Sequence, residues 1–331
     1  METDKFPSRS VMFLPPLAFL VNQVLRKSPR KITLLTNDIL TKILRTFDLE
    51  THDVLHPLQG AFRNETWVIR TKQGRKVIKR YKESLSRDQI IYEHSILQYL
   101  AQNDFPAVRV VLNKDHQTVL EIDHRYYAAF DFLEGYVNYG DYFYIPNQFQ
   151  KFVRIEGKLL AKLHLVLRSF TPLGSTKYGV NPSTGIRYQG VEFLLENLGR
   201  CKEQYRNTPD GKKHPFCKEL INHIPILQER LRLIDQVLAE TQPLCTIIHG
   251  DFRPYNLMIS PGKPVTVLDF ELAHYDYRLI DLISLLRSSS NIYKRPEDDP
   301  AMIEIFKSYQ SVYPIPEDEL HVFHLVWQWQ K

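Results

Sequence analysis

The spacing of hydrophobic residues changes along the chain, and this change limits the folds that the chain can form. Residues 64–81 contain two β-rich runs around the turn KQG, which is the pattern of a hairpin. Residues 87–102 then carry apolar residues at helical spacing. Three further short β-type runs follow, at 109–113, 118–122 and 125–133. A hairpin, a helix and more strands in this order predict a small lobe of mixed structure.

From Gly135 onward the pattern becomes mainly helical. Apolar stripes in 152–167 and 279–286 predict two buried helices, and an amphipathic helix is expected at 36–47, before the hairpin. The length of 331 residues suits two lobes of ordinary size. We therefore predict an α+β, two-lobed fold, with an N-terminal antiparallel sheet plus helix and a mainly helical C-terminal lobe.

The same pattern gives boundaries for the parts of the chain. The predicted parts are an N-terminal apolar arm, a first lobe and a helical second lobe, at 1–35, 36–134 and 135–331. Polar segments rich in proline or glycine predict loops at 171–190 and 207–215. The apolar stretch of the arm holds two prolines and is too short to span a bilayer. We expect the arm to pack on the protein, with contact to a membrane surface or a partner as the alternative.

The composition excludes several classes of protein. Hydrophobic residues make up 43% of the chain and charged residues 24%, which is ordinary for a soluble globular protein. The net charge of +5 is small and is not gathered into a basic stripe, so no nucleic-acid partner is expected, whereas a polyanion such as ATP suits it. The 3 cysteines form no CxxC pair and leave an odd count. This argues against a disulfide framework and a zinc site, and fits a reducing cytoplasm.

A polar loop between two apolar runs is the strongest sign of a functional site. The loop HGDFRPYN, residues 249–256, holds Asp251 and Asn256, and Asp269 then ends the next apolar strand in VTVLDFE. Asp and Asn are common in exposed loops simply because their side chains bond nearby backbone groups. Here three oxygen-bearing side chains stand at the ends of apolar strands, which favours a site. His249 is expected to be a buried hydrogen-bonding residue that shapes the loop.

The residues needed for phosphoryl transfer from ATP occur in order along the chain. This chemistry needs a lysine on the phosphates, a carboxylate paired with it, a base for the acceptor hydroxyl and oxygen ligands for Mg²⁺. Lys79 lies on the second hairpin strand and Glu93 on the following helix. Asp251 is the candidate base, and Asn256 and Asp269 are the candidate metal ligands. A solvated helix residue is the alternative for Glu93.

These motifs resemble the aminoglycoside phosphotransferase and choline kinase-like family, whose members are small-molecule kinases with a protein-kinase-like fold. HGDFRPYN matches the family's HGDxxxxN loop, and VLDFELA is similar to its metal-binding segment. RKVIKRY looks like its lysine strand, FDFLEG like its hinge and RLIDL like its closing helix. The resemblance covers nearly all of residues 48–290. It implies a kinase that uses ATP and Mg²⁺ as cofactors.

The resemblance also bears on two cations. Lys76 and Lys79 lie on opposite sides of one strand, and the family's lysine follows two strand hydrophobics, as Lys79 does. Arg253 lies two positions after the proposed base, where protein kinases carry a lysine that reaches the transferred phosphate. A cation there would offset developing charge, so we place Arg253 in the catalytic set with Asp251. A surface arginine is the alternative.

At the hinge, the resemblance implies that backbone groups bind adenine. The carbonyl of Asp131 and the amide of Leu133 would serve, with Phe130 either behind the ring or in the core. Two features depart from the expected motifs. The loop over the phosphates lacks the GxGxxG of protein kinases. Asp276 stands where the family commonly has glycine, which leaves the conformation of that segment open.

Three functions are compatible with these residues. The favoured one is an ATP-dependent O-phosphotransferase acting on a small molecule, such as an amino alcohol, hydroxy amino acid, sugar or aminoglycoside. A protein kinase is disfavoured because the helix-forming segment RLIDLISLL follows Asp269 too soon for an activation loop. A catalytically inactive binding or structural protein is disfavoured because the motif residues are intact. The acceptor and the oligomeric state do not follow from the sequence.

Overall fold

The computed structural model describes the chain in several ranges. They are 35–57, 64–139, 149–180, 196, 199–200, 203, 215–289, 299–324 and 326. The predicted arm at 1–35 therefore lies outside the described residues, except for residue 35, and so does most of the predicted loop at 207–215. In the described part of the chain, no helix is both long and apolar enough to cross a bilayer.

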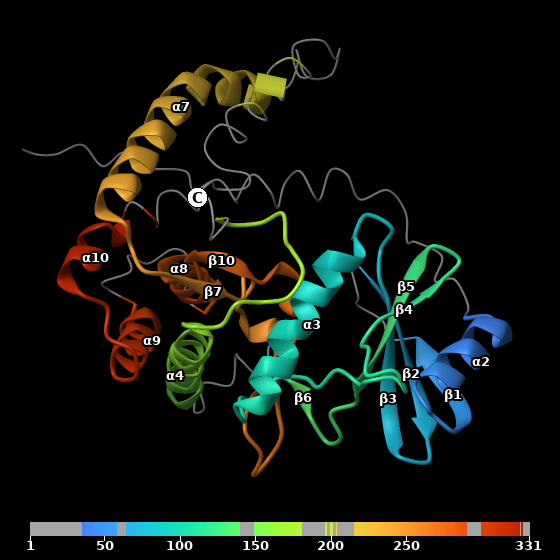
Figure 1. Ribbon diagram of the computed structural model, residues 1–331. Coiled ribbons are helices and arrows are strands. Elements are labelled where there is room, and N and C mark those ends of the chain that lie inside the picture. The colour runs from blue at the N-terminus through green and yellow to red at the C-terminus, as the bar shows by residue number, and fades with distance from the viewer. Residues whose placement is uncertain are drawn as a thin grey trace, which may run out of the picture. The chain divides into compact units, whose positions relative to one another are not determined.

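An antiparallel sheet of five strands forms the N-terminal region, in the order β1-β2-β3-β5-β4 (Figure 1). Its strands are β1 Thr51–Pro57, β2 Glu65–Thr71, β3 Gly74–Arg80, β4 Leu120–Ile122 and β5 Arg125–Asp131. The predicted hairpin is β2 and β3, in register from Glu65↔Arg80 to Thr71↔Gly74. Gly74 has φ +100°, which a residue with a side chain rarely adopts, so the tight turn needs glycine there.

Side chains of the sheet alternate between two cores. Tyr127 and Ala129 pack with Ile43 of helix α2 (Asn37–Thr46) on one face. Ala128 and Phe130 lie in the larger core with helix α3 (Arg87–Gln102) on the other face. The alternation follows from the two-residue period of a strand. The two helices thus cover opposite faces of the sheet (Figure 1).

Helix α3 begins where its sequence dictates. Ser86 caps it by accepting a hydrogen bond from the backbone of Gln89, whose side chain accepts one from the backbone of Ser86. This reciprocal arrangement satisfies two backbone donors that a helix start leaves without partners. The helix runs through the predicted range 87–102 and buries Ile96 and Leu100 fully.

The predicted strand at 109–113 is wrong. Only a single bridge, Val110↔Phe130, and two backbone hydrogen bonds join this segment to β5. β4 pairs with the first residues of β5, so only the end of that strand edge is left for this segment. The run then ends at Asn113, whose side chain accepts hydrogen bonds from the backbone of Asp115 and Gln117 and so forms a turn.

Helices and short strands make up the C-terminal region. The helices are α4 Phe149–Leu167, α7 Pro215–Thr241, α8 Arg278–Ser288, α9 Pro300–Gln310 and α10 Glu317–His321. Two small antiparallel sheets accompany them, one of β7 Cys245–Ile248 and β10 His274–Tyr277, the other of β6 Val137–Asn138, β8 Leu257–Ile259 and β9 Thr266–Val267. The predicted α+β fold is confirmed, with an antiparallel N-terminal sheet and a mainly helical C-terminal part.

Helices α4 and α9 pack closely against each other, and α4 also contacts β7. A Cβ atom on Gly157 would lie 2.4 Å from the carbonyl oxygen of Ile305, so only glycine allows this approach. Leu160 and Leu163 of α4 are fully buried in the same core as Ile247 of β7. The packed helices thus hold β7, from which the motif loop begins.

Candidate active site

The loop HGDFRPYN connects β7 to β8, as the flanking apolar runs predict. Gly250 has φ +78°, and a Cβ atom there would lie 2.2 Å from the carbonyl oxygen of Leu272. Both the backbone conformation and the close neighbour therefore require glycine. The loop ends in a turn of 3-10 helix, η2 Pro254–Asn256, before β8 begins. Asp251 thus lies near the start of the loop, and Asn256 lies at its end.

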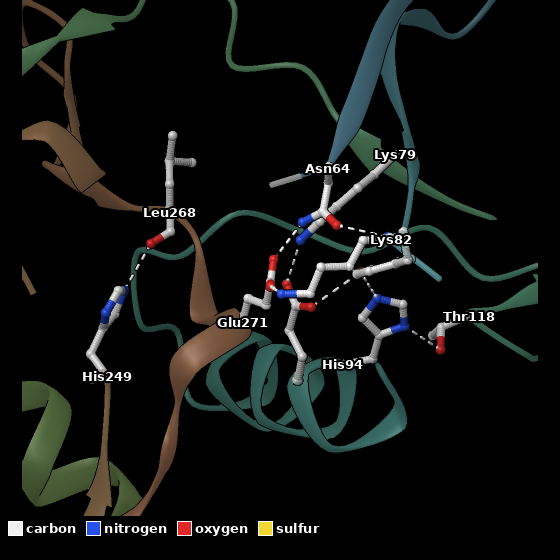
Figure 2. Close-up of polar contacts among 10 residues, drawn as sticks. Asn64, Lys79, Lys82, His94, Thr118, His249, Leu268 and Glu271 are labelled. Atoms are coloured by element: carbon white, nitrogen blue, oxygen red, sulfur yellow. Dashed lines mark hydrogen bonds and ion pairs between the residues drawn. The ribbon is translucent and has the colours of Figure 1, made fainter. Parts of the chain in front are cut away.

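His249 shapes the loop from inside, as the sequence predicts. Its side chain is fully buried, and its Nδ1 accepts a hydrogen bond of 3.2 Å from the backbone N–H of Asp251. The Nε2 atom therefore carries the proton and donates to the carbonyl oxygen of Leu268 at 2.8 Å (Figure 2). The imidazole of His249 thus joins the candidate base to the segment that carries Asp269.

A second buried side chain, which the sequence did not single out, supports the same turn. The carboxylate of Asp281 on α8 accepts hydrogen bonds from the backbone of His249 at 2.6 Å and of Gly250 at 2.9 Å. It also pairs with His164 Nε2 at 3.2 Å. Burial raises the pKa of Asp281, but the hydrogen bond and charge of His164 outweigh burial and the net pKa lies below its usual value. The carboxylate is therefore charged where it holds the loop.

The candidate base is held by its neighbours in the loop. Asn256 Nδ2 donates to the backbone carbonyl of Asp251 at 2.8 Å and to its Oδ2 at 3.1 Å. Arg253 Nε lies 2.5 Å from Asp251 Oδ1. Each carboxylate oxygen has a second lone pair, so both can still accept a proton donor from a ligand. The structure thus brings Asp251, Arg253 and Asn256 together.

The two candidate metal ligands present oxygen atoms. Because Asn256 uses its amide nitrogen on Asp251, its Oδ1 is left as the acceptor, and it accepts no hydrogen bond from the described residues. Asp269 is exposed, and no side chain in the described ranges donates to it. Carboxylate and amide oxygens are the ligands that suit Mg²⁺, which keeps waters and phosphate oxygens as its other ligands. The described residues contain no group of three His, Cys, Asp or Glu side chains that could hold a metal. The oxygen atoms of Asn256 and Asp269 suit a metal whose other ligands are waters and phosphate oxygens.

Asp269 stands at a strained point of the backbone. Its φ of 60° and ψ of 67° lie in the left-handed region, just before the short helix η3 Phe270–Leu272. Such strain persists only where the surroundings fix it, and it is concentrated at functional sites. The backbone N–H of Leu268 donates to the carbonyl oxygen of Asn256 at 2.8 Å, which holds the two candidate ligands on neighbouring segments. After η3, Asp276 is buried in β10, so the segment continues as a strand.

The two lysines of β3 have different partners. Lys79 Nζ lies 3.0 Å from Glu93 Oε1 of α3, whereas Lys76 Nζ lies 2.6 Å from Asp131 Oδ1 on the other face of the sheet. Burial lowers the pKa of Lys79, but the carboxylates of Glu93, Asp269 and nearby Glu271 outweigh it, so the pKa is raised and the lysine is charged. Glu93 is therefore not a solvated helix residue.

A buried chain of hydrogen bonds lies behind Glu93, and Figure 2 shows its last link, from His94 to Thr118. The hydroxyl of Tyr81 donates to Glu93 Oε2 at 3.2 Å and lies 2.8 Å from His94 Nε2. His94 Nδ1 lies 2.7 Å from the hydroxyl of Thr118. Burial and the charge of Lys79 lower the pKa of His94 to about 3, so the imidazole is neutral. Because the Tyr81 proton goes to Glu93, Nε2–H of His94 donates to Tyr81 and Nδ1 accepts from Thr118.

At the proposed hinge, the side chain of Asp131 has a partner within the protein, whereas the backbone amide of Leu133 has none among the described residues. The carboxylate of Asp131 is occupied by Lys76. The amide of Leu133 donates no hydrogen bond within the described ranges, so it is free to meet a ligand. Phe130 is buried in the larger core, with its ring edge-on to His94 at 5.6 Å. The adenine contacts assigned to these backbone groups stay a prediction.

The fold and the site together define a class of phosphotransferase. A lysine of the sheet that pairs with a glutamate of α3, a held aspartate and two candidate metal ligands are the parts that phosphoryl transfer needs. The chain belongs to the phosphotransferase enzyme family, APH, whose model matches residues 54–318. It is thus a kinase-type transferase. A comparison with curated proteins gave no match.

Solved structures of similar fold include several small-molecule kinases. Amicoumacin kinase hAmiN, in complex with AMP-PNP, Ca²⁺ and Ami, has a TM-score of 0.60 and 15% identity, covering 88% of this chain and 84% of its own. A microcompartment-associated aminopropanol kinase has a TM-score of 0.58 and 18% identity over 89% of this chain and 90% of its own. Choline kinase LicA from Streptococcus pneumoniae has a TM-score of 0.54 and 13% identity over 88% and 87%. At these identities the likeness concerns the fold.

Proposed function

We propose that this protein is an ATP- and Mg²⁺-dependent O-phosphotransferase that phosphorylates a hydroxyl group of a small molecule. The observation that carries the proposal is the geometry of Asp251 in the HGDFRPYN loop, where Arg253 and Asn256 both contact its carboxylate. Nucleotide complexes among the similar structures, with AMP-PNP and Ca²⁺ or with ADP, support a nucleotide and a divalent metal.

Each residue has a separate part in the proposed reaction. The Asp251 carboxylate would accept a hydrogen bond from the acceptor hydroxyl, orient it and take its proton as the hydroxyl oxygen bonds to the γ-phosphorus of ATP. The bond from that phosphorus to the β-phosphate oxygen breaks, and ADP leaves. Lys79, held by Glu93, contacts the phosphates of the nucleotide, and Arg253 offsets charge on the transferred group. Asn256 and Asp269 would hold Mg²⁺, which neutralises phosphate oxygens when bound.

The hinge would complete the nucleotide site. The carbonyl of Asp131 and the amide of Leu133 are the proposed adenine contacts, and the proposed lobes meet at this hinge between 134 and 135. A small acceptor suits the site better than a protein does. Helix α8 begins at Arg278, so residues 270–277 alone separate it from Asp269, and these form η3 and β10. That leaves no activation segment for a protein substrate. A cytoplasmic location also stays a prediction.

Two measurements test the proposal in order. Millimolar Mg·ATP should raise the melting temperature, because a ligand at 100 times its Kd adds about 2.7 kcal/mol to the free energy of unfolding. An ADP-release assay should then find turnover with one of a panel of amino alcohols, hydroxy amino acids, sugars and aminoglycosides. An unchanged melting temperature would remove the nucleotide-binding part. Binding without turnover on any acceptor would favour the inactive binding protein.

A further inference from the structure

Glu271 lies two residues after Asp269, yet its side chain has quite different contacts. Its Oε1 accepts a hydrogen bond from Lys82 Nζ at 2.9 Å, and its Oε2 accepts one from Asn64 Nδ2 (Figure 2). The side chain is nearly buried, with 5% of its surface exposed, whereas Asp269 is exposed. Both Glu271 oxygens thus face donors that lie next to strands of the N-terminal sheet.

The two donors are themselves fixed to each other and to the lysine strand. Lys82 follows β3 directly after Tyr81, and Asn64 immediately precedes β2. Asn64 Oδ1 accepts a hydrogen bond of 3.2 Å from the backbone N–H of Lys82. Asn64 is 9% exposed, and both its amide nitrogen and its amide oxygen have hydrogen-bond partners within the protein. Glu271 therefore meets a preformed pair of donors.

The physical cost of separating these groups is high. A charge-assisted hydrogen bond is stronger than a neutral one, and it is strengthened further where water is excluded. Removing Lys82 would take from a nearly buried carboxylate the cation that is hydrogen-bonded to it, which is unfavourable. The contact spans 189 residues of sequence and joins the strand of Lys79 to the segment of Asp269.

From these contacts we infer that Glu271 is a positioning residue, which fastens the Asp269 segment to the Lys79 strand and is not itself a metal ligand. The lysine and the aspartate would then approach the same phosphate groups at a set spacing. This inference rests on the proposed function for its consequence on nucleotide binding. The clasp itself, meaning Asn64, Lys82 and Glu271, rests on the contacts alone.

The test compares two variants that break the clasp from opposite sides. Lys82→Met and Glu271→Gln should each weaken Mg·ATP binding about 10-fold in calorimetry, an effect the size of one charged hydrogen bond. The double variant should be no weaker than either single variant, because the second change removes nothing more. Lys72→Met is the control, since Lys72 makes an exposed ion pair with Glu50 at the hairpin turn. It should leave the affinity unchanged.

A role of Glu271 as a metal ligand predicts different effects of the two variants. If Glu271 binds the metal, Glu271→Gln will raise the Mg²⁺ concentration needed to bind nucleotide, while Lys82→Met will not. That outcome, or additive losses in the double variant, would overturn the inference.

A second measurement needs no nucleotide, so it separates failure of the clasp from failure of the proposed function. In the free protein, Lys82→Met should speed amide hydrogen exchange in residues 268–273 relative to the wild type and to Lys72→Met. Unchanged exchange there would overturn the clasp even if Mg·ATP binds. Faster exchange in a protein that does not bind Mg·ATP would keep the clasp and remove the proposed function.

Discussion

The two ion pairs of the proposed site have opposite surroundings. Lys79 and Glu93 expose 12% and 5% of their side chains, whereas Arg253 and Asp251 expose 53% and 27%. The first pair is backed by Tyr81 and a neutral histidine in the core, and the second by a loop that water reaches. The ion pair proposed to contact the nucleotide is therefore buried and fixed before any ligand binds, whereas the ion pair proposed to meet the acceptor is accessible to water.

This difference has an energetic meaning. Charges away from water interact strongly and keep their places, whereas exposed charges are screened and exchange partners at little cost. A nucleotide has the same phosphates at every turnover and suits a fixed cation. An acceptor has to enter, lose a proton and leave, which suits a carboxylate whose present partners are easily replaced.

The largest expected effect tests the open side. Asp251→Asn keeps the size of the side chain but removes the proton acceptor, and general-base catalysis is worth roughly 10²–10⁴-fold. Phosphorylation should fall by about that factor, with Mg·ATP affinity within a few-fold of the wild type. Asp269→Asn is the matched variant, and it should damage nucleotide binding and turnover together. A rate that survives Asp251→Asn unchanged would show that this carboxylate is not the base.

The next effect tests the buried side. Lys79→Ala should lower kcat/KM by about 10²-fold, the usual loss when one donor to developing charge is removed. Lys76→Ala should leave kcat/KM close to that of the wild type, because Lys76 pairs with Asp131 on the other face of the sheet. Steady-state kinetics with varied ATP distinguishes them. The reverse pattern would assign the phosphate contact to Lys76.

The buried side should also make stability depend on pH. The pKa of His94 is about 3 in the folded protein and 6.5 when unfolded, so the unfolded chain binds the proton more readily. Its contribution to stability is complete above pH 6.5 and is lost as the pH falls, at about 1.4 kcal/mol per pH unit. Urea unfolding of the wild type between pH 6.5 and 4.5 should show this extra slope, and His94→Gln should lack it. Equal slopes would mean that the histidine is not held neutral.

The smallest effect returns to the exposed pair. Arg253→Ala should change the free energy of unfolding by less than about 1 kcal/mol, because exposed ion pairs contribute little. Lys79→Ala should cost about 3 kcal/mol or more, since it removes the countercharge of the buried Glu93. Chemical denaturation of both variants measures the contrast directly. Similar losses would mean that burial does not separate the two pairs.

The sequence predicted the elements whose signals are local. The helix at 87–102 and the hairpin at 64–81 could be predicted because the hydrophobic period and the turn residues lie within a few positions. The run at 109–113 has the composition of a strand, but it pairs with β5 through a single bridge because β4 occupies the first part of the same edge. No local sequence pattern reveals that β4 takes this edge. Predictions for residues 1–34 lie outside the described ranges.

The site was predictable to the extent that motifs carry it. The pairing of Lys79 with Glu93, and the grouping of Asp251 with Asn256, followed from motif order. The supporting residues were missed because their contacts join distant parts of the chain, as with Asp281 and His164, 117 residues apart. A weak signal was present in α3, where His94 follows Glu93 among apolar residues at helical spacing. A buried polar residue implies partners but does not name them.

The contacts of Asp281 with the motif loop also affect the order in which parts of the chain fold during synthesis. The chain is synthesised from its N-terminus, so the motif loop leaves the ribosome before helix α8 does. Until residue 281 emerges, the backbone N–H groups of His249 and Gly250 lack the acceptor that holds their turn. We therefore expect the loop to take its working shape only after α8 has been made and packed. A nascent chain arrested before α8 should leave the amides of His249 and Gly250 open to hydrogen exchange.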